Sequence, residues 1–295
     1  MTLKNRVKIP IILYHDVVPQ AEMKNVPRDR RHYTLSAENF KTQMAYLKKT
    51  GRKGIDFSTF YSLVQTDAKL LSSDRYVVLT FDDGHVSQAR WALPILKEFG
   101  FTASFFLISN WVGTPGFVSE KEVRGLVAAG MDVQSHTANH TFLMELNSHQ
   151  AVEELVGSKK RLERLTGKPV RFLSLPGGRS DRSVWQLCGI YGYEGILTSL
   201  FGYGNFQPFW EKVHANGYVP HGYYRLAMSR GMHLSTFRHL IENKGWLPRY
   251  FRWRNQTAKL AKTIVGHRTY HKIWLWVFGS QGETLGGKNM GADHA

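Results

Sequence analysis

The stretch YVVLTFDDG, residues 76–84, is the part of the chain that first indicates the fold. Residues 76–81 are mostly apolar and rich in β-formers, as in a buried strand. The strand runs directly into Asp82-Asp83-Gly84, where glycine permits a tight turn. Two adjacent carboxylates after a buried strand are costly unless a cation or another partner uses them. The alternative is an ordinary strand-end turn, for which Asp-Asp-Gly is a common sequence.

Outward from this stretch, apolar runs alternate with helical patterns. Ser119 is expected to cap one helix, with Glu122 completing a capping box. This alternation favours a parallel sheet with helices outside it, and such folds gather their chemistry at the carboxyl ends of strands. The predicted strands are residues 9–14, 76–81, 103–108, 131–134 and 172–175. The predicted helices are residues 37–50, 88–99, 119–129 and 148–165.

Polar clusters follow several of these strands: His15, Asp82-Asp83, His136 and Pro176-Gly177-Gly178. In the segment His136–His140 the two histidines are four residues apart, which predicts that they share one face of a helical turn. This spacing recurs at divalent-metal sites. Two histidines with one carboxylate leave coordination positions open for water, as catalytic metal sites do. The alternative is a pair of surface histidines in a chain that contains 13 of them.

Together these motifs resemble the NodB-type polysaccharide deacetylases, carbohydrate esterase family 4. The family's TFDDG motif is matched by residues 80–84, and its H-[ST]-x-x-H motif by His136–His140. The similarity covers roughly residues 9–230. It implies an α/β fold, a distorted (β/α) barrel of about seven parallel strands. It also implies Asp83, His136 and His140 as ligands of one divalent metal ion, with zinc expected and cobalt, nickel or manganese as alternatives. Asp82 would be the general base toward a metal-bound water.

The third motif of the family departs from its usual form, R-x-P-x-G. Here it reads Ser174-Leu175-Pro176-Gly177-Gly178, so the arginine that would orient the base is missing. Arg225, on a later strand, is predicted to supply that cation, and Arg179 is the second candidate. The alternative for either arginine is a solvated surface charge. We expect Pro176, Gly177 and Gly178 to contact the substrate, with a backbone N–H near this segment helping to stabilise the oxyanion.

The last family motif, Leu-x-x-His, has no clear match, because His221 and His233 are poorly placed after apolar strands. The first strand instead ends in Tyr14-His15-Asp16. This resembles the permuted subgroup that deacetylates extracellular poly-N-acetylglucosamine, in which such a strand comes first. We therefore predict His15 as the general acid and Tyr14 as a substrate contact. The alternative is a strand-end histidine that only helps to close the barrel.

Composition adds further expectations. The 295 residues include 39 Lys and Arg, 23 Asp and Glu, and a single cysteine, Cys188, which is expected in the core. No signal peptide or membrane span is recognisable, which predicts a cytoplasmic protein. Residues 1–240 are predicted to form the catalytic domain, and residues 241–295 a basic, aromatic-rich helical extension with a flexible tail.

Within that extension, residues 245–278 contain seven Lys or Arg, eight aromatic residues and no Asp or Glu. This composition fits either a helix packed on the barrel or peripheral contact with an anionic membrane at its inner face. No nucleic-acid-binding motif is present, so nucleic acid is not an expected partner.

The sequence thus predicts a metal-dependent hydrolase that removes an N-acetyl group from an amino sugar of a polysaccharide or its lipid-linked precursor. Three alternatives stay open. A deformylase of a lipid-linked formamido sugar would use the same residues. A hydrolase of a non-sugar amide or cyclic imide is a second alternative. A carbohydrate-binding barrel without catalysis is the third, although such a protein would not need Asp82, Asp83, His136 and His140 together.

Overall fold

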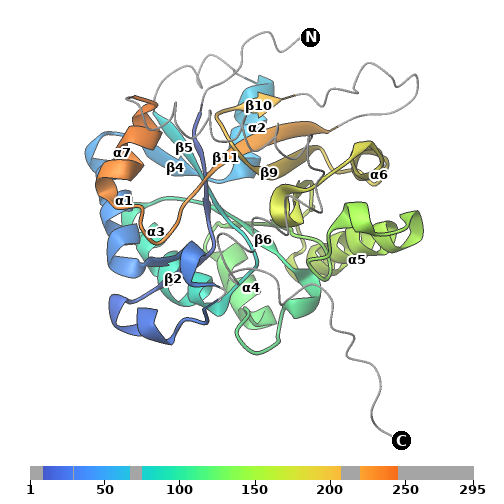
Figure 1. Ribbon diagram of the computed structural model, residues 1–295, viewed down its shortest axis with the longest axis horizontal. Helices are drawn as coiled ribbons and strands as arrows, with labels where there is room; N and C mark the ends of the chain where they lie inside the picture. The colour runs from blue at the N-terminus through green and yellow to red at the C-terminus, as the bar shows by residue number, and fades with distance from the viewer. Residues whose placement is uncertain (1–8, 29, 67–74, 207–219, 245–295) are drawn as a thin grey trace, which may run out of the picture.

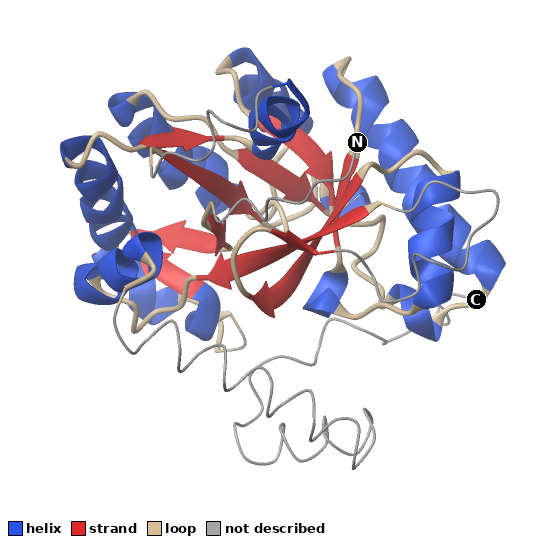
Figure 2. Ribbon diagram, turned by 90° about the horizontal axis from the view of Figure 1, so that it is seen from above, coloured by secondary structure: helices blue, strands red, loops and turns tan. Residues whose placement is uncertain are grey.

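A computed structural model describes residues 9–28, 30–66, 75–206 and 220–244. Seven parallel strands close into a barrel, and helices surround it on the outside (Figures 1 and 2). This confirms the barrel that the sequence predicted. Around the barrel the strands run β5 (Tyr76–Phe81), β6 (Ser104–Leu107), β7 (Asp132–Ser135), β8 (Phe172–Ser174), β9 (Gly195–Phe201), β11 (His221–Ala227) and β1 (Ile11–Tyr14).

The first strand of the chain closes the barrel. β1 pairs with β5 along one edge, from Ile11 opposite Val78 to Tyr14 opposite Phe81. Along its other edge it pairs with β11, with Ile12 opposite Leu226. The carboxyl end of β1 therefore lies between the carboxyl ends of β5 and β11. His15, the next residue, is brought to the same mouth as the residues that follow β5.

The remaining strands are accessory to the barrel. β4 (Lys53–Ile55) pairs with the beginning of β5, and β2 (Asp16–Val18) pairs with β3 (Thr34–Ser36) as a separate parallel sheet. β10 (Asn205–Phe206) is antiparallel to β11. The α-helices are α1 (Ala37–Lys49), α2 (Phe57–Thr66), α3 (Leu93–Phe99), α4 (Glu120–Ala128), α5 (Ser148–Thr166), α6 (Arg182–Ile190) and α7 (Leu234–Glu242).

The four helices that the sequence predicted are present with small shifts of their ends. α4 begins with the expected capping box, in which Ser119 accepts from the backbone N–H of Glu122 and the Glu122 carboxylate accepts from that of Ser119. The predicted helix over residues 88–99 is divided: Gln88–Ala92 is a turn of π-helix, which continues into α3. A π-turn widens the helix locally, and such turns are frequent at functional sites.

Residues alternate between two apolar layers along each barrel strand. Outward-facing residues such as Val77, Leu79 and Phe81 pack with the surrounding helices in the main core. Inward-facing residues such as Val78 and Phe106 form a second core inside the barrel. Aromatic side chains of α2 belong to this inner core, where Phe57 lies 4.8 Å between ring centroids from both Phe172 and Tyr223. The part of the barrel interior away from the carboxyl ends of the strands is therefore filled with apolar side chains.

The described residues bear on two further expectations. No helix within these ranges is long and apolar enough to cross a membrane. Cys188 is buried in α6, as expected, and burial raises the pKa of its thiol. Residues 245–295 lie outside the described residues, so the division of the chain at residue 240 and the nature of the extension stay predictions.

Candidate active site

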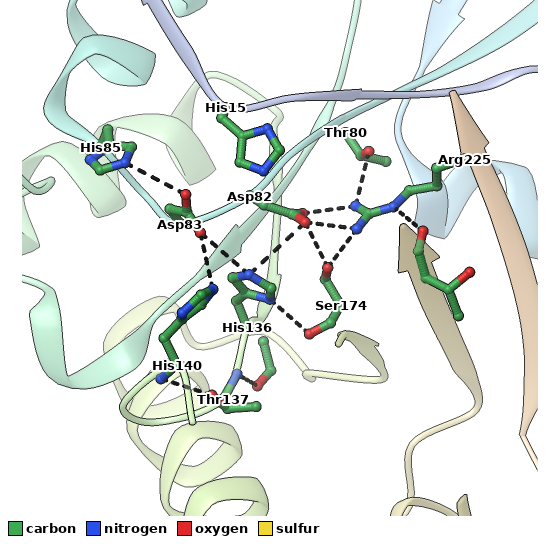
Figure 3. Close-up of polar contacts among 12 residues, drawn as sticks. His15, Thr80, Asp82, Asp83, His85, His136, Thr137, His140, Ser174 and Arg225 are labelled. Carbon is green, nitrogen blue, oxygen red and sulfur yellow. Dashed lines mark hydrogen bonds and ion pairs between the residues drawn. The ribbon is translucent and has the colours of Figure 1, made fainter. Parts of the chain in front are cut away.

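The inner face of the barrel changes from apolar to polar toward the carboxyl ends of its strands. On β5 the inward series that starts at Val78 continues with Thr80 and Asp82, because alternate residues share a face. The same parity brings Ser174 of β8 and Arg225 of β11 inward, and all four polar side chains are buried. Figure 3 shows these groups converging with His136, which follows β7. The site is thus the polar continuation of the inner core.

Three candidate metal ligands meet at this mouth. Single ligand atoms of Asp83, His136 and His140 all lie within 4.8 Å of one another. Oδ1 of Asp83 is 3.3 Å from Nε2 of His136 and 3.7 Å from Nε2 of His140. Two imidazole nitrogens and one carboxylate oxygen form a donor set that suits zinc and related divalent ions. The residues present therefore fit the metal that the family resemblance implies.

The hydrogen bonding of His136 directs one ring nitrogen to this centre. Its Nδ1 is 2.7 Å from the backbone carbonyl oxygen of Ser174, which can only accept, so Nδ1 carries the hydrogen. In the neutral ring Nε2 is then unprotonated and available as a ligand. Burial lowers the pKa of His136, but the charges of Asp82 and Asp83 outweigh it and leave the pKa raised. For His140, burial and the charge of His136 lower the pKa to about 4.

The segment that carries both histidines is a loop, and the predicted helical turn is wrong. Residues 136–142 form no helix, and Thr137 and His140 have positive φ angles of 65° and 61°. An α-helical turn would require negative φ at both. The buried carboxylate of Glu154, on α5, holds the loop by accepting from the backbone N–H groups of Ala138 (2.9 Å) and Asn139 (2.8 Å). A tertiary contact therefore replaces the local hydrogen bonds of a helix.

Asp82, the predicted base, is paired with Arg225 in a buried bidentate contact. Arg225 Nη1 is 2.8 Å from Oδ1 and Nη2 is 2.7 Å from Oδ2, and the arginine is fully buried. Ser174 donates to Asp82 Oδ2 at 2.8 Å and accepts from Arg225 Nη2 at 2.8 Å. Burial would raise the pKa of Asp82, but the Arg225 charge and His136 lower it below its ordinary value. Asp82 is therefore held as a carboxylate.

The structure separates the two arginines that the sequence left open. Arg225 reaches Asp82 from β11, whereas Arg179 lies 3.3 Å from the exposed Glu145 and over the ring of Phe142. Ser174 occupies the position of the family's missing arginine, and its small side chain leaves room for the guanidinium that arrives from β11. The arginine that pairs with the predicted general base, Asp82, is thus present, but it comes from β11 and not from the third motif after β8.

His15 belongs to the same cluster. Its ring interacts electrostatically with Asp83, Asp82, Arg225 and His136, and it packs against the ring of Tyr33, with centroids 4.8 Å apart and planes tilted by 35°. Burial lowers the pKa of His15 more than the carboxylates raise it. The buried side chain of Gln88, in the π-turn, donates to the backbone carbonyl oxygens of both His15 (3.0 Å) and Asp82 (2.5 Å). The candidate acid and base are thereby tied together.

Tyr14 does not reach the site, so its prediction as a substrate contact is wrong. Its side chain is buried and donates to Gln43 of α1 at 2.8 Å. Alternation along β1 explains this, because Tyr14 faces the helices.

Pro176, Gly177 and Gly178 form a short 3-10 turn (η7, Pro176–Gly178) that directly follows β8, at the mouth of the barrel. A Cβ on Gly178 would lie 2.8 Å from the backbone nitrogen of Ser199, so the close approach requires glycine. Their contact with substrate stays a prediction.

Sequence reasoning missed three supporting residues: Ser174, Gln88 and Glu154. Ser174 was visible as the changed position of the third motif, but a serine gives no sign of which distant strand supplies the arginine. Gln88 and Glu154 lie in helical patterns, where polar residues are ordinary. Their partners are 73 and 16 positions away in the sequence, for His15 and Ala138 respectively. Only tertiary packing reveals such pairs.

Comparisons with known proteins agree with this site. Residues 71–196 match the family model described as polysaccharide deacetylase, and this range includes Asp82, Asp83, His136 and His140. The chain therefore contains a polysaccharide deacetylase domain of the NodB type.

Among its relatives is YxkH of Bacillus subtilis, whose name assigns it provisionally to the polysaccharide deacetylases. It is 25% identical over 236 residues, which are 80% of this chain and 77% of the relative. The poly-beta-1,6-N-acetyl-D-glucosamine N-deacetylase of Staphylococcus epidermidis is 26% identical over 165 residues, 51% of this chain. The match spans only 56% of that relative.

Solved structures share the fold. The crystal structure of a polysaccharide deacetylase from Bacillus cereus is 25% identical, with a TM-score of 0.64 over 79% of this chain and 69% of that one. The Streptococcus pyogenes deacetylase PplD is 22% identical, with a TM-score of 0.66 over 80% of this chain and 99% of that one.

Proposed function

We propose that this chain is a metal-dependent N-deacetylase that hydrolyses the N-acetyl group of an amino sugar in a polysaccharide or its lipid-linked precursor. One observation carries the proposal: three candidate metal ligands face one point beside a carboxylate that a buried arginine holds ionised. Membership of the deacetylase family and the N-acetylglucosamine polymer named for the Staphylococcus epidermidis relative support the substrate class.

The metal site would be formed by Asp83, His136 and His140. When bound, a divalent ion there polarises an acyl oxygen and lowers the pKa of water. The chain's own part is to keep this donor set fixed. The Ser174 carbonyl fixes the His136 ring, and Glu154 fixes the loop that presents His140.

Proton transfer falls to Asp82 and His15. Asp82 takes the proton of the attacking water, and it can do so because its depressed pKa leaves it ionised near neutral pH. Arg225 and Ser174 fix the orientation of the carboxylate. As the carbon–nitrogen bond breaks, protonated His15 donates to the departing amine. Burial lowers the pKa of His15, which makes its protonated form a stronger acid. The products are acetate and the free amine.

Release of acetate and formate from N-acetylated and N-formylated glucosamine oligomers tests the proposal. The purified chain would be assayed after removal of metal and after adding back zinc, cobalt, nickel or manganese singly. We expect metal-dependent acetate release that is lost in Asp82→Asn. Formate release alone would replace the proposal with a deformylase. Tight metal binding without release from any oligomer would redirect it to a lipid-linked or non-sugar substrate.

We further propose that the enzyme acts on the cytoplasmic side and contacts an anionic membrane surface through residues 245–278. The basic and aromatic composition of this segment supports the proposal. Full-length protein should sediment with vesicles that contain anionic lipid, and a chain that ends at residue 244 should sediment less. Equal sedimentation of the two chains would contradict membrane contact.

A further inference from the structure

The two carboxylate oxygens of Asp83 face different neighbours. Oδ1 is the atom near the ring nitrogens of His136 and His140, whereas Oδ2 is 3.5 Å from Nε2 of His85. The backbone of Asp83 has a φ of 75°, a left-handed conformation that costs energy outside glycine. Such a residue keeps its conformation only where its surroundings hold it. His85 is one of those surroundings (Figure 3).

His85 is itself held tightly. It is 5% exposed, and its ring stacks on Phe117 with centroids 4.8 Å apart and an interplanar angle of 26°. Its Nδ1 is 3.0 Å from Nη1 of Arg30. Its Nε2 faces two carboxylates, with Oδ2 of Asp83 at 3.5 Å and Oδ2 of Asp16 at 3.8 Å. The ring therefore links the metal site to a second polar group behind it.

Arg30 decides which nitrogen of His85 carries the hydrogen. A guanidinium has only donors, so the ring nitrogen next to it must accept. Nδ1 is then unprotonated, and the hydrogen of the neutral ring is on Nε2, facing Asp83. Arg30 is fixed by the buried Asp16, whose Oδ2 accepts from Nη1 of Arg30 at 3.0 Å. Oδ1 of Asp16 accepts from Ser87 at 2.6 Å.

We propose that His85 is a positioning residue of the metal site, and that Arg30 sets its tautomer from outside the barrel. The Nε2–H group of His85 holds Oδ2 of Asp83, so that only Oδ1 is directed to the metal. Asp16 acts one step further out by holding Arg30. This inference rests on the proposed metal-dependent function and assigns a role to residues that the catalytic motifs do not include.

Metal affinity measures this role without relying on activity. Full-length protein stripped of metal would be titrated with Zn²⁺ by calorimetry. His85→Phe keeps a ring against Phe117 but removes the donor, and we expect about ten- to a hundredfold weaker binding. Arg30→Met should also weaken Zn²⁺ binding. Arg30→Lys should bind Zn²⁺ nearly as tightly as the wild type, because lysine also provides a donor.

Two comparisons separate positioning from general damage. Arg31, the next residue, donates to the backbone carbonyl oxygens of Val26 and Lys24, so Arg31→Met should leave Zn²⁺ affinity unchanged. If Arg30 acts through His85, the double variant His85→Phe/Arg30→Met should bind Zn²⁺ as His85→Phe alone does. Losses that add in the double variant would overturn the linked roles. Unchanged affinity in His85→Phe would overturn the proposal itself.

The tautomer can be observed in the unmodified protein. Nitrogen-15 NMR of histidine-labelled, metal-free protein distinguishes protonated from unprotonated ring nitrogens, and His85→Phe identifies the His85 signals by their loss. We expect the hydrogen on Nε2. A hydrogen on Nδ1 would overturn the inference even if Arg30→Met does not fold. If wild-type protein binds no Zn²⁺, the proposed function fails, whereas the tautomer result still decides the contact between Arg30 and His85.

Discussion

Buried and half-buried carboxylates occur at two levels of this barrel, and they are stabilised in different ways. Around the amino ends of β6 and β7, Asp56 and Asp132 accept hydrogen bonds from neutral groups. We call this the amino-end cluster, and its donors are Thr59, Thr102, Ser104 and Gln134. At the carboxyl ends, Asp82 and Asp83 face Arg225 and histidines instead.

The difference appears in the pKa values. Burial raises the pKa of Asp132, since hydrogen bonds from Ser104 and Gln134 only partly offset it. Burial acts in the same direction on Asp83, but the neighbouring rings of His136 and His85 outweigh it and lower the pKa well below the ordinary value. Neutral donors satisfy a carboxyl group as part of the fold. Charged and titratable partners keep a carboxylate ionised, which metal binding and proton transfer require. Four predictions test this contrast.

The largest expected effect is the loss of a candidate metal ligand. His140→Ala should abolish Zn²⁺ binding and reduce deacetylation to background, because two ligands remain of three. His149→Ala is the matched control, since the side chain of His149 is 83% exposed and lies next to Glu153 on the surface of α5. Calorimetry and acetate release measure both variants. Full activity in His140→Ala would show that Asp83, His136 and His140 do not form the metal site.

The second effect concerns the candidate acid. His15→Gln should slow amide deacetylation by about 10²–10⁴-fold, the usual contribution of general acid catalysis. An aryl acetate with a good leaving group needs no proton at that step, so its hydrolysis should change little. His233→Gln serves as the control, because His233 is exposed at the N-cap of α7. Equal losses on both substrates would mean that His15 supports the site in another way.

The third effect is on stability. Arg225→Met leaves Asp82 buried without its cation, which should lower the free energy of unfolding by about 3–5 kcal/mol. The double variant Arg225→Met/Asp82→Asn should recover part of this loss, because no buried charge remains. Arg179→Met should cost less than about 1 kcal/mol, since its partner Glu145 is exposed. Denaturant unfolding checks the order, and equal losses for the two arginines would contradict it.

The smallest effect is a pH dependence in the amino-end cluster. The raised pKa of Asp132 means that the folded protein keeps a proton which the unfolded chain releases from about pH 3.8 upward. Its contribution to stability should therefore fall as pH rises through that window, by about 1.4 kcal/mol per unit of pKa shift. The difference in unfolding free energy between wild type and Asp132→Asn should shrink as pH rises. A difference that grows as pH rises would contradict the raised pKa of Asp132 in the folded protein.

The sequence by itself determined the alternation of strands and helices, because burial imposes apolar runs on β5 and β6 and a capping box marks the start of α4. It also determined the position of Asp82, Asp83, His136 and His140 at strand ends. These features depend on local patterns, which a single sequence displays. The family resemblance then supplied the barrel that the structure confirms.

Only the tertiary structure decided which distant residues complete the site. Asp82 and Arg225 are 143 positions apart, and closure of the barrel by β1 between β5 and β11 brings their strands close. The loop at His136–His140 is shaped by Glu154 of α5 and not by the four-residue spacing of its histidines, so the predicted helical turn was wrong. Tyr14 and His15 are adjacent in sequence, yet Tyr14 faces the helices while His15 joins the cluster at the mouth. Strand alternation and closure are properties of the assembled barrel, and the local pattern contains neither the partner strand nor its register.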